Sequence, residues 1–226
     1  MSDAPIAILG GTGDQGLGLA LRFCAAARAV VIGSRTLDRA VAAAANVRGQ
    51  VAGARVEGLD NGDATARAGI VILSVPFEHT AGTLKAIRDR LAPGQIVVSM
   101  GVPLASAVGD AASRMVGVWQ GSCAELVAAL VPDGVHVVSA FQNVSAHRLQ
   151  HLPDPVECDV VVSGDKEPRA RVMALCGLIP GLRAVDGGPL ANARIVESIT
   201  ALLIGLNIRY RVADGIGIRF TGIPTS

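Results

Sequence analysis

A glycine-rich turn near the start of the chain carries the clearest chemistry. The apolar run Ile6–Leu9 leads into Gly11, Gly13 and Gly16, spaced as Gly-x-Gly-x-x-Gly, and a helical pattern follows at once. In this arrangement the glycines allow a tight turn, a close approach of the backbone to a phosphate, and close packing of helix on strand. The helix start then offers backbone N–H groups and a positive dipole end to an anion. The turn therefore predicts a dinucleotide-binding site made by Gly11, Thr12, Gly13, Asp14, Gln15 and Gly16.

The end of the second apolar run indicates which dinucleotide is bound. A site for NAD usually has an acidic residue here to accept hydrogen bonds from the ribose hydroxyls. This chain instead has Ser34 and Arg35, with Arg39 one helical turn further on. Guanidinium and hydroxyl groups suit a 2′-phosphate, whereas an acid would repel it. The alternative is that the arginines only decorate a helix start, where positive charge is mildly unfavourable. The residues favour NADP over NAD.

Composition limits the class of protein. The 226 residues are 50% hydrophobic with a mean hydropathy of +0.47, and 20 basic residues against 19 acidic ones leave a net charge of +1. We therefore expect neither nucleic acid nor a membrane surface among the partners. The longest apolar runs, Ile199–Leu206 and Ile70–Val75, are shorter than the roughly 20 residues that span a bilayer. No signal peptide and no paired cysteines are evident, which is typical of a cytoplasmic protein with buried thiols.

The elements that must position these residues alternate along the chain. Short apolar runs, which predict buried strands, are separated by helical patterns. The expected strands are Ile6–Leu9, Val30–Ile32, Ile70–Val75, Ile96–Ser99, His136–Ala140, Val160–Ser163 and Leu182–Val185. This alternation predicts an α/β fold, a Rossmann-type doubly wound parallel sheet with right-handed crossovers.

A small C-terminal α/β extension is expected to end in a long helix. We predict a nucleotide-binding domain over residues 1–153 and a smaller substrate-binding portion over residues 154–226. The last helix, from Leu190 to about Val212, places Ala193, Val196 and Thr200 on one apolar stripe that continues through Ile204 and Ile208. Such a helix closes a substrate cleft, packs in a dimer, or simply joins the core.

Five segments together resemble one enzyme family. These are GGTGDQG, the GSR after the second strand, SVPFEH, VVSAFQNVSA and GPLANARIVESIT. They resemble the F420-dependent NADP oxidoreductases over residues 6–219, and the last segment is far more specific than the glycine turn. The resemblance implies a homodimeric enzyme that transfers a hydride directly between NADP(H) and the deazaflavin coenzyme F420.

The resemblance also implies roles for particular residues. Thr12 to Gln15 would meet the pyrophosphate, and Ser34, Arg35 and Arg39 the 2′-phosphate. The path toward the nicotinamide would be lined by Val75, Pro76, His79, Val102 and Ala146. The deazaflavin would lie against Gln142, Asn143 and Val144, with Arg194, Ser198, Thr200 and Ile216 on its other side.

Direct hydride transfer requires the two reacting carbons in close contact, and neither a nucleophile nor a metal. The sequence accordingly suggests no metal site, and Arg194 and Thr200 are the candidates for stabilising charge on the acceptor ring. Two of these residues have other interpretations. Arg194 and Ser198 would also fit a surface ion pair and a hydroxyl bonded back to its own helix. His79 would also fit a helix cap.

The acceptor half of the resemblance is imperfect. The family often has His, followed by Ile-Pro, where this chain has Gln142 and then Val144-Ser145. Glutamine can donate a hydrogen bond but cannot become cationic near neutral pH. Two alternatives therefore stay open: an NADPH-dependent reductase of another planar heterocycle, such as a flavin or a methanopterin-type pterin, and a non-catalytic NADPH-binding protein.

Overall fold

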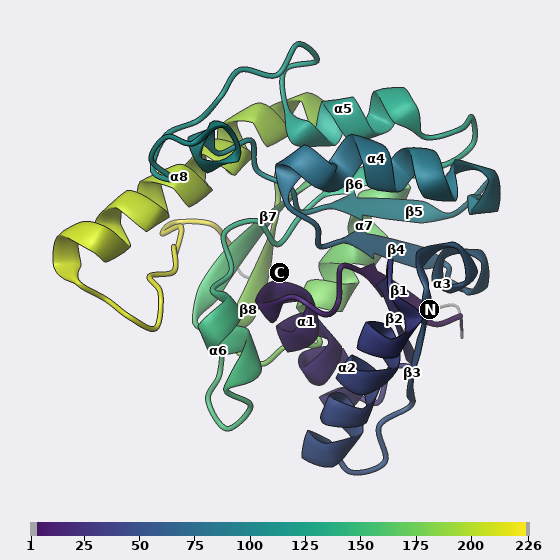
Figure 1. The fold of residues 1–226 in the computed structure, drawn as a ribbon. Helices are drawn as coiled ribbons and strands as arrows, with labels where there is room; N and C mark the ends of the chain where they lie inside the picture. The colour runs from purple at the N-terminus through teal and green to yellow at the C-terminus, as the bar shows by residue number, and fades with distance from the viewer. Residues whose placement is uncertain (1–3, 225–226) are drawn as a thin grey trace.

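The computed structural model describes residues 4–224 and has one eight-stranded sheet (Figure 1). The strands lie in the order β3-β2-β1-β4-β5-β6-β7-β8. Their bounds are β1 (Ile6–Leu9), β2 (Val30–Ser34), β3 (Val56–Asp60), β4 (Ile70–Leu73), β5 (Ile96–Ser99), β6 (His136–Ser139), β7 (Cys158–Gly164) and β8 (Leu182–Asp186). The predicted Rossmann-type α/β fold is confirmed.

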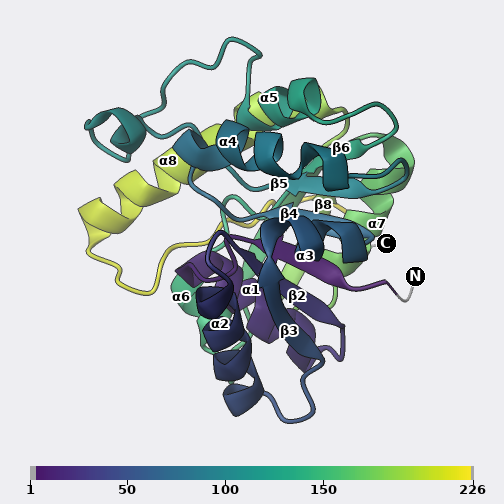
Figure 2. The same ribbon diagram turned by 45° about the vertical axis from the view of Figure 1, so that its right-hand side comes forward.

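Helices cover both faces of the sheet (Figures 1 and 2). The α-helices are α1 (Asp14–Ala25), α2 (Leu37–Gln50), α3 (Asn61–Arg67), α4 (Phe77–Ile87), α5 (Cys123–Leu130), α6 (Ala146–Gln150), α7 (Lys166–Cys176) and α8 (Ala193–Tyr210). Short 3₁₀ turns are η1 (Arg88–Arg90), η2 (Ala105–Val108) and η3 (Leu190–Asn192).

Alternate residues of each central strand enter two separate cores, because successive side chains of a strand point to opposite faces. In β1, Ile6 and Ile8 pack with α1, α2, α6 and α7, whereas Ala7 and Leu9 pack with α3, α4 and α5. The strand is apolar throughout because both of its faces are buried.

Two features of the sheet differ from the sequence prediction. Strand β7 pairs with β6 in the antiparallel direction, and β8 then pairs with β7 in parallel, so the sheet is mixed. Apolar periodicity does not encode strand direction. Strand β3 and helix α3 were not predicted; β3 is an edge strand, and its sequence Val-Glu-Gly-Leu-Asp is only partly buried.

The bounds of the last helix also differ from the sequence prediction. The last helix begins at Ala193, after η3, and ends at Tyr210. Its apolar stripe does not stay buried to the end, since Ile208 is 69% exposed.

The segment Leu190–Tyr210 is long and apolar enough to cross a membrane by length and composition. Sequence reasoning did not find this segment, because only uninterrupted apolar runs were considered. One such helix is weak evidence for a membrane span, because the core helix of a soluble protein passes the same test.

All four cysteines are buried free thiols, as expected.

Candidate functional site

Three adjoining cavities form one groove at the carboxyl edge of the sheet. The first has a volume of about 370 Å³, the second about 400 Å³ and the third about 410 Å³. The first and second share Gly13 and Val75, and the second and third share Gln15, Gln142 and Thr200. The groove thus passes the point between β1 and β4 where the strand order reverses, which is where ligands bind in open α/β sheets. We call the first cavity, which contains Arg35, the nucleotide end, and the third, which contains Ile216, the acceptor end. The second cavity is the middle cavity.

The glycine turn has the geometry that its spacing predicts. A Cβ atom on Gly16 would lie 2.7 Å from Cα of Gly11, so these two glycines are required by the packing of α1 on β1. A Cβ on Gly13 would meet only the carbonyl oxygen of Gly10, at an ordinary 3.5 Å. The fold therefore does not require glycine at position 13, and the free space there faces the groove. Because the first N–H groups of a helix have no partner within it, those at the start of α1 remain available to an anion.

The nucleotide end has two exposed cations. Arg35 and Arg39 line its cavity together with Ser34, and neither arginine forms an ion pair within residues 4–224. The Ser34 hydroxyl accepts the Thr36 N–H at 3.2 Å and so fixes the turn into α2. Two guanidinium groups and a hydroxyl at one cavity have the chemistry to bind a dianion.

The nucleotide end also includes residues that sequence reasoning missed. Asn61 follows β3 directly, and its buried Oδ1 has no hydrogen-bond partner. Thr36, Ser74 and Thr83 also line the cavity. Once β3 is recognised, its carboxyl end points to Asn61, because the carboxyl ends of parallel strands meet at one edge of the sheet.

His79 lies at the nucleotide end, in the cavity that contains Arg35. The N-cap of α4 is Pro76, so the capping role considered for His79 is wrong. Val75 and Pro76 line both the nucleotide end and the middle cavity, and Val102 lines the middle cavity. Phe77, Met100, Gly101, Leu104 and Ile204 complete the middle cavity.

Gln15 connects the glycine turn to the loop after β6. Its Nε2 donates to the carbonyl oxygens of Phe141 at 3.0 Å and Val144 at 3.1 Å. Phe141 has a positive φ of 70° and packs its ring edge-on against Phe23. The Gln15 side chain is thereby occupied in holding this loop, which leaves its backbone N–H for a phosphate.

The loop after β6 forms the floor of the acceptor end. Gln142 is buried, its Nε2 donates to the Ser139 hydroxyl, and its Oε1 has no partner. The Thr200 hydroxyl donates to the Gln142 carbonyl at 3.1 Å and ties α8 to the loop. Asn143, Val144 and Ile216, which were predicted to contact the deazaflavin, line the same cavity. Ala146, which was predicted for the path toward the nicotinamide, lies in this cavity and not in the other two.

Two predicted residues of α8 lie away from the groove. Arg194 donates to Glu125 at 2.7 Å, and the Ser198 hydroxyl donates to the Arg194 carbonyl at 3.0 Å. Neither lines any of the three cavities. These are the surface ion pair and the back-bonded hydroxyl that the sequence also allowed.

A buried acid anchors α8 instead. Glu197 is 1% exposed and accepts the N–H groups of Cys123 at 2.9 Å and Ala124 at 3.0 Å, at the start of α5. Burial raises the pKa of Glu197 to about 7, although the two N–H donors act in the opposite direction. Cys123 beside it has a pKa raised to about 11, again by burial first. Among residues 4–224 no cluster of three or more His, Cys, Asp or Glu side chains could hold a metal ion.

Comparisons with known proteins follow this geometry. Residues 5–103 match the family model described as NADP oxidoreductase coenzyme F420-dependent. The chain is 47% identical to the F420-dependent NADP reductase of Methanocaldococcus jannaschii, over 96% of this chain and 98% of that protein. It is 45% identical to the protein of the same name from Methanothermobacter thermautotrophicus, over 97% and 95% of the two chains.

A solved structure is similar in fold. The crystal structure of a putative F420-dependent NADP reductase from Arthrobacter superposes with a TM-score of 0.78, covering 96% of this chain and 100% of that one. Its 22% sequence identity supports the shared fold alone.

Proposed function

Since this chain belongs to the F420-dependent NADP oxidoreductase family, we propose that its groove holds NADP(H) and coenzyme F420 side by side and transfers a hydride between them. The observation that carries this proposal is the continuity of the three cavities through Gly13, Gln15 and Gln142. A continuous groove allows two ligands to meet in its middle, as direct hydride transfer demands.

The nucleotide end fits NADP(H). The free space at Gly13 suits a pyrophosphate at the start of α1, and Ser34, Arg35 and Arg39 suit the 2′-phosphate. Asn61 also lines this cavity, and its unpartnered, buried Oδ1 could accept a donor group of the ligand if the side chain turned toward the groove. The residues present therefore match the cofactor that the family name implies.

When bound, the nicotinamide and deazaflavin rings would provide the two carbons between which the hydride is transferred. The chain's own residues orient and desolvate the two rings. Val102, Leu104 and Ile204 give the middle of the groove an apolar lining that excludes water. Gln142 and Thr200 lie between the middle cavity and the acceptor end, where they would contact the acceptor ring.

Charge that gathers on the acceptor ring is stabilised by nearby donors. Thr200 can serve if its hydroxyl turns from the Gln142 carbonyl to the ring. For Arg194 the same role requires its side chain to leave Glu125. We therefore favour Thr200 over Arg194 as the stabilising group.

An absorbance assay tests the proposal. Purified protein with NADPH should bleach the deazaflavin band of F420, and calorimetry should show tighter binding of NADP⁺ than of NAD⁺. Turnover of a flavin or a pterin without F420 bleaching would show that this heterocycle, and not F420, is the acceptor. Tight NADPH binding without hydride transfer to any acceptor would show that the protein is a non-catalytic NADPH-binding protein.

We also propose that the protein is a homodimer that pairs through α8. One face of this helix has a stripe made of Ile195, Ile199, Leu202, Leu206 and Tyr210, a spacing that keeps apolar side chains on one side of a helix. Three of the five are well exposed: Ile195 at 67%, Leu202 at 58% and Tyr210 at 67%. An exposed apolar stripe of this size is typical of a protein–protein interface.

Light scattering during gel filtration tests the dimer. We expect Leu202→Glu to give monomers, because a charge at the centre of an apolar interface is costly to bury. Leu37→Glu is the matched control, since Leu37 is also exposed but lies on α2. A monomeric wild-type protein, or a dimeric Leu202→Glu variant, would count against this interface.

We propose a cytoplasmic location, supported by four free buried thiols, which suit a reducing compartment. The near-neutral net charge of +1 gives no electrostatic reason to expect nucleic acid or an anionic membrane as a partner. Cell fractionation tests the location: recovery in the membrane fraction would count against it.

A further inference from the structure

The chain after α8 returns to the sheet (Figure 1). It also lines the acceptor end. We call residues 212–220 the C-terminal segment. Ala213, Gly215 and Ile216 of this segment line the acceptor cavity. The segment has no helix or strand of its own, so its position depends on contacts with the rest of the molecule.

The first half of the C-terminal segment is fixed by α6 and α8. The Ser145 hydroxyl donates to the Asp214 carbonyl at 2.7 Å, and Arg148 Nε donates to the Gly215 carbonyl at 2.8 Å. The Ile216 N–H donates to Asn207 Oδ1 at 2.8 Å. A Cβ on Gly215 would lie 2.5 Å from the Ser145 hydroxyl, so the C-terminal segment and the start of α6 are in close contact.

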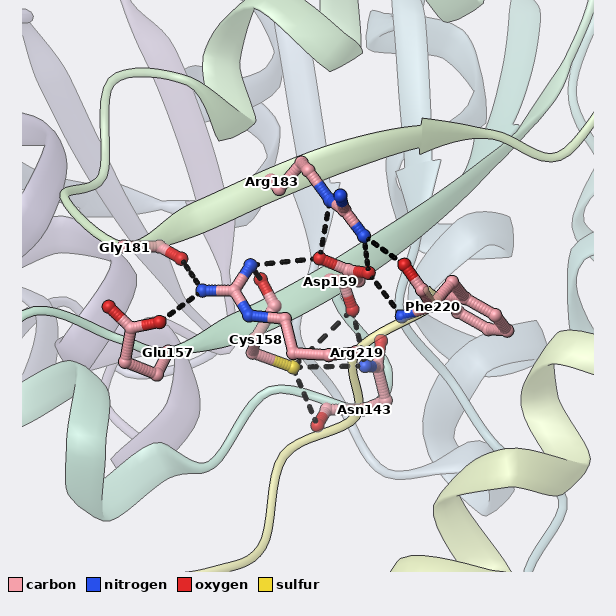
Figure 3. A network of polar contacts seen from close by, with 8 residues as sticks. All are labelled: Asn143, Glu157, Cys158, Asp159, Gly181, Arg183, Arg219 and Phe220. Atoms are coloured by element: carbon pink, nitrogen blue, oxygen red, sulfur yellow. Dashed lines mark hydrogen bonds and ion pairs between the residues drawn. The ribbon is translucent and has the colours of Figure 1, made fainter. Parts of the chain in front are cut away.

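The second half of the C-terminal segment is held by Asp159 of β7 (Figure 3). The Asp159 carboxylate is fully buried and accepts hydrogen bonds from Arg219 Nη1 at 2.8 Å, the Phe220 N–H at 2.7 Å and Arg183 Nε at 2.9 Å. The Asp159 N–H donates to the Ile218 carbonyl at 2.8 Å.

Arg219 extends this attachment to three further groups. Its guanidinium donates to the carbonyls of Cys158 at 3.2 Å and Gly181 at 2.7 Å, and to the Glu157 carboxylate. Burial by itself raises the pKa of Asp159, but hydrogen bonds from Arg183, Phe220 and Arg219 outweigh it and lower the pKa to about 2. The carboxylate therefore stays ionised and paired at neutral pH.

The loop after β6, which also lines the acceptor cavity, is tied to the same strand. Asn143 Nδ2 donates to the Asp159 carbonyl at 2.8 Å and contacts Cys158 Sγ at 3.2 Å (Figure 3). The start of β7 thus sets the distance between the loop after β6 and the C-terminal segment.

We propose that Asp159 and Arg219 are positioning residues for acceptor binding, because together they fix the C-terminal segment, which lines the acceptor cavity together with Asn143. This inference rests on the proposed function. Neither residue lines the groove, so both act through the wall that they hold. Acceptor binding should depend on this network, and NADP(H) binding should not.

Arg219→Ala tests the inference in the 226-residue protein, with NADPH and F420 as the two varied substrates. Arg219 side-chain exposure is 38%, and the Asp159–Arg183 pair between β7 and β8 remains in the variant. We expect the KM for F420 to rise about tenfold and the KM for NADPH to stay within about twofold. Hydrogen exchange should become faster in residues 212–220 and stay unchanged in α1.

Two further variants control the experiment. Arg219→Lys keeps a charge near Asp159 but cannot bridge the other acceptors, so we expect a KM for F420 between those of wild type and Arg219→Ala. Arg67→Ala removes an arginine–carboxylate pair with Glu57, far from the segment, and should leave both KM values unchanged. Should Arg219→Ala fail to fold, the Lys variant decides by the same comparison.

The outcomes separate this inference from the proposed function. An unchanged KM for F420 in Arg219→Ala, or an equal rise in both KM values, would overturn the positioning role alone. A wild-type protein that does not bleach F420 would overturn the proposed function and the inference with it.

Discussion

The two ends of the groove are assembled over different distances along the chain. At the nucleotide end, Gly13 lies in the turn after β1, Ser34 is the last residue of β2, and Asn61 directly follows β3. At the acceptor end, the cavity is lined by the loop after β6, by α8 and by the C-terminal segment. Gln15 reaches residues 126 and 129 positions away, and Thr200 bonds across 58 positions. Short turns at the ends of neighbouring strands therefore form the nucleotide end, whereas long-range contacts must hold the acceptor end.

The largest expected effect is at the nucleotide end. Arg35→Asp replaces a cation of the 2′-phosphate site by an anion, so NADPH binding should weaken by about 100-fold or more, roughly 3 kcal/mol. NADH lacks this phosphate and should bind as before. Calorimetry with both nucleotides measures the effect, with Arg88→Asp as a control that lines none of the cavities. Equal losses for NADPH and NADH would contradict the assignment.

Substitutions of two glycines in the turn after β1 should affect different properties, one nucleotide binding and the other the stability of the fold. Gly13→Ala should weaken NADPH binding about tenfold, because the new methyl group occupies space that the fold leaves open. Gly16→Ala should instead lower the melting temperature, because its Cβ would meet Gly11 Cα at 2.7 Å. Thermal unfolding and nucleotide titration distinguish the two variants. Gly82→Ala, with nothing within 4 Å of its Cβ, should change neither property.

A pH effect is expected where α8 is anchored. The pKa of Glu197 rises from 4.5 to about 7 in the folded protein, so the folded state holds a proton that the unfolded state loses within this range. The free energy of unfolding should therefore fall as pH rises from 4.5 to 7, by on the order of 2 kcal/mol. Denaturant titrations should show this slope in the wild type and a smaller one in Glu197→Gln. Asp159 titrates below this window and does not obscure the comparison.

The smallest expected effect is at the contact between α8 and the loop after β6. Thr200→Val removes one hydrogen bond to the Gln142 carbonyl without changing the size of the side chain. We expect kcat/KM for F420 to fall about fivefold, roughly 1 kcal/mol, while NADPH binding is kept. Steady-state kinetics measure it, and Ser198→Ala is the control because its hydroxyl bonds within α8. A larger loss in Ser198→Ala than in Thr200→Val would reverse these assignments.

The order of apolar runs, the glycine turn and the cluster Ser34, Arg35 and Arg39 could all be predicted from the sequence. Each depends on neighbours close in the chain, where spacing and residue type have direct structural meaning. Strand β3 could not be predicted, because an edge strand is partly exposed and Gly58 interrupts its apolar pattern. That glycine is required by packing, since a Cβ would lie 2.2 Å from the backbone of Ala40.

The division into residues 1–153 and 154–226, and the roles given to individual site residues, stay predictions. The tertiary structure decided which side chains meet in the groove. It directed Gln15 onto the loop after β6, paired Arg194 with Glu125, and buried Asp159 between two arginines. No local pattern marks these contacts, because their partners come from elements far apart in the chain. The sequence by itself therefore determined the buried parallel strands at the centre of the sheet and the glycine turn after β1, through local geometry and charge. Only the packing of distant elements determined the shape of the acceptor end.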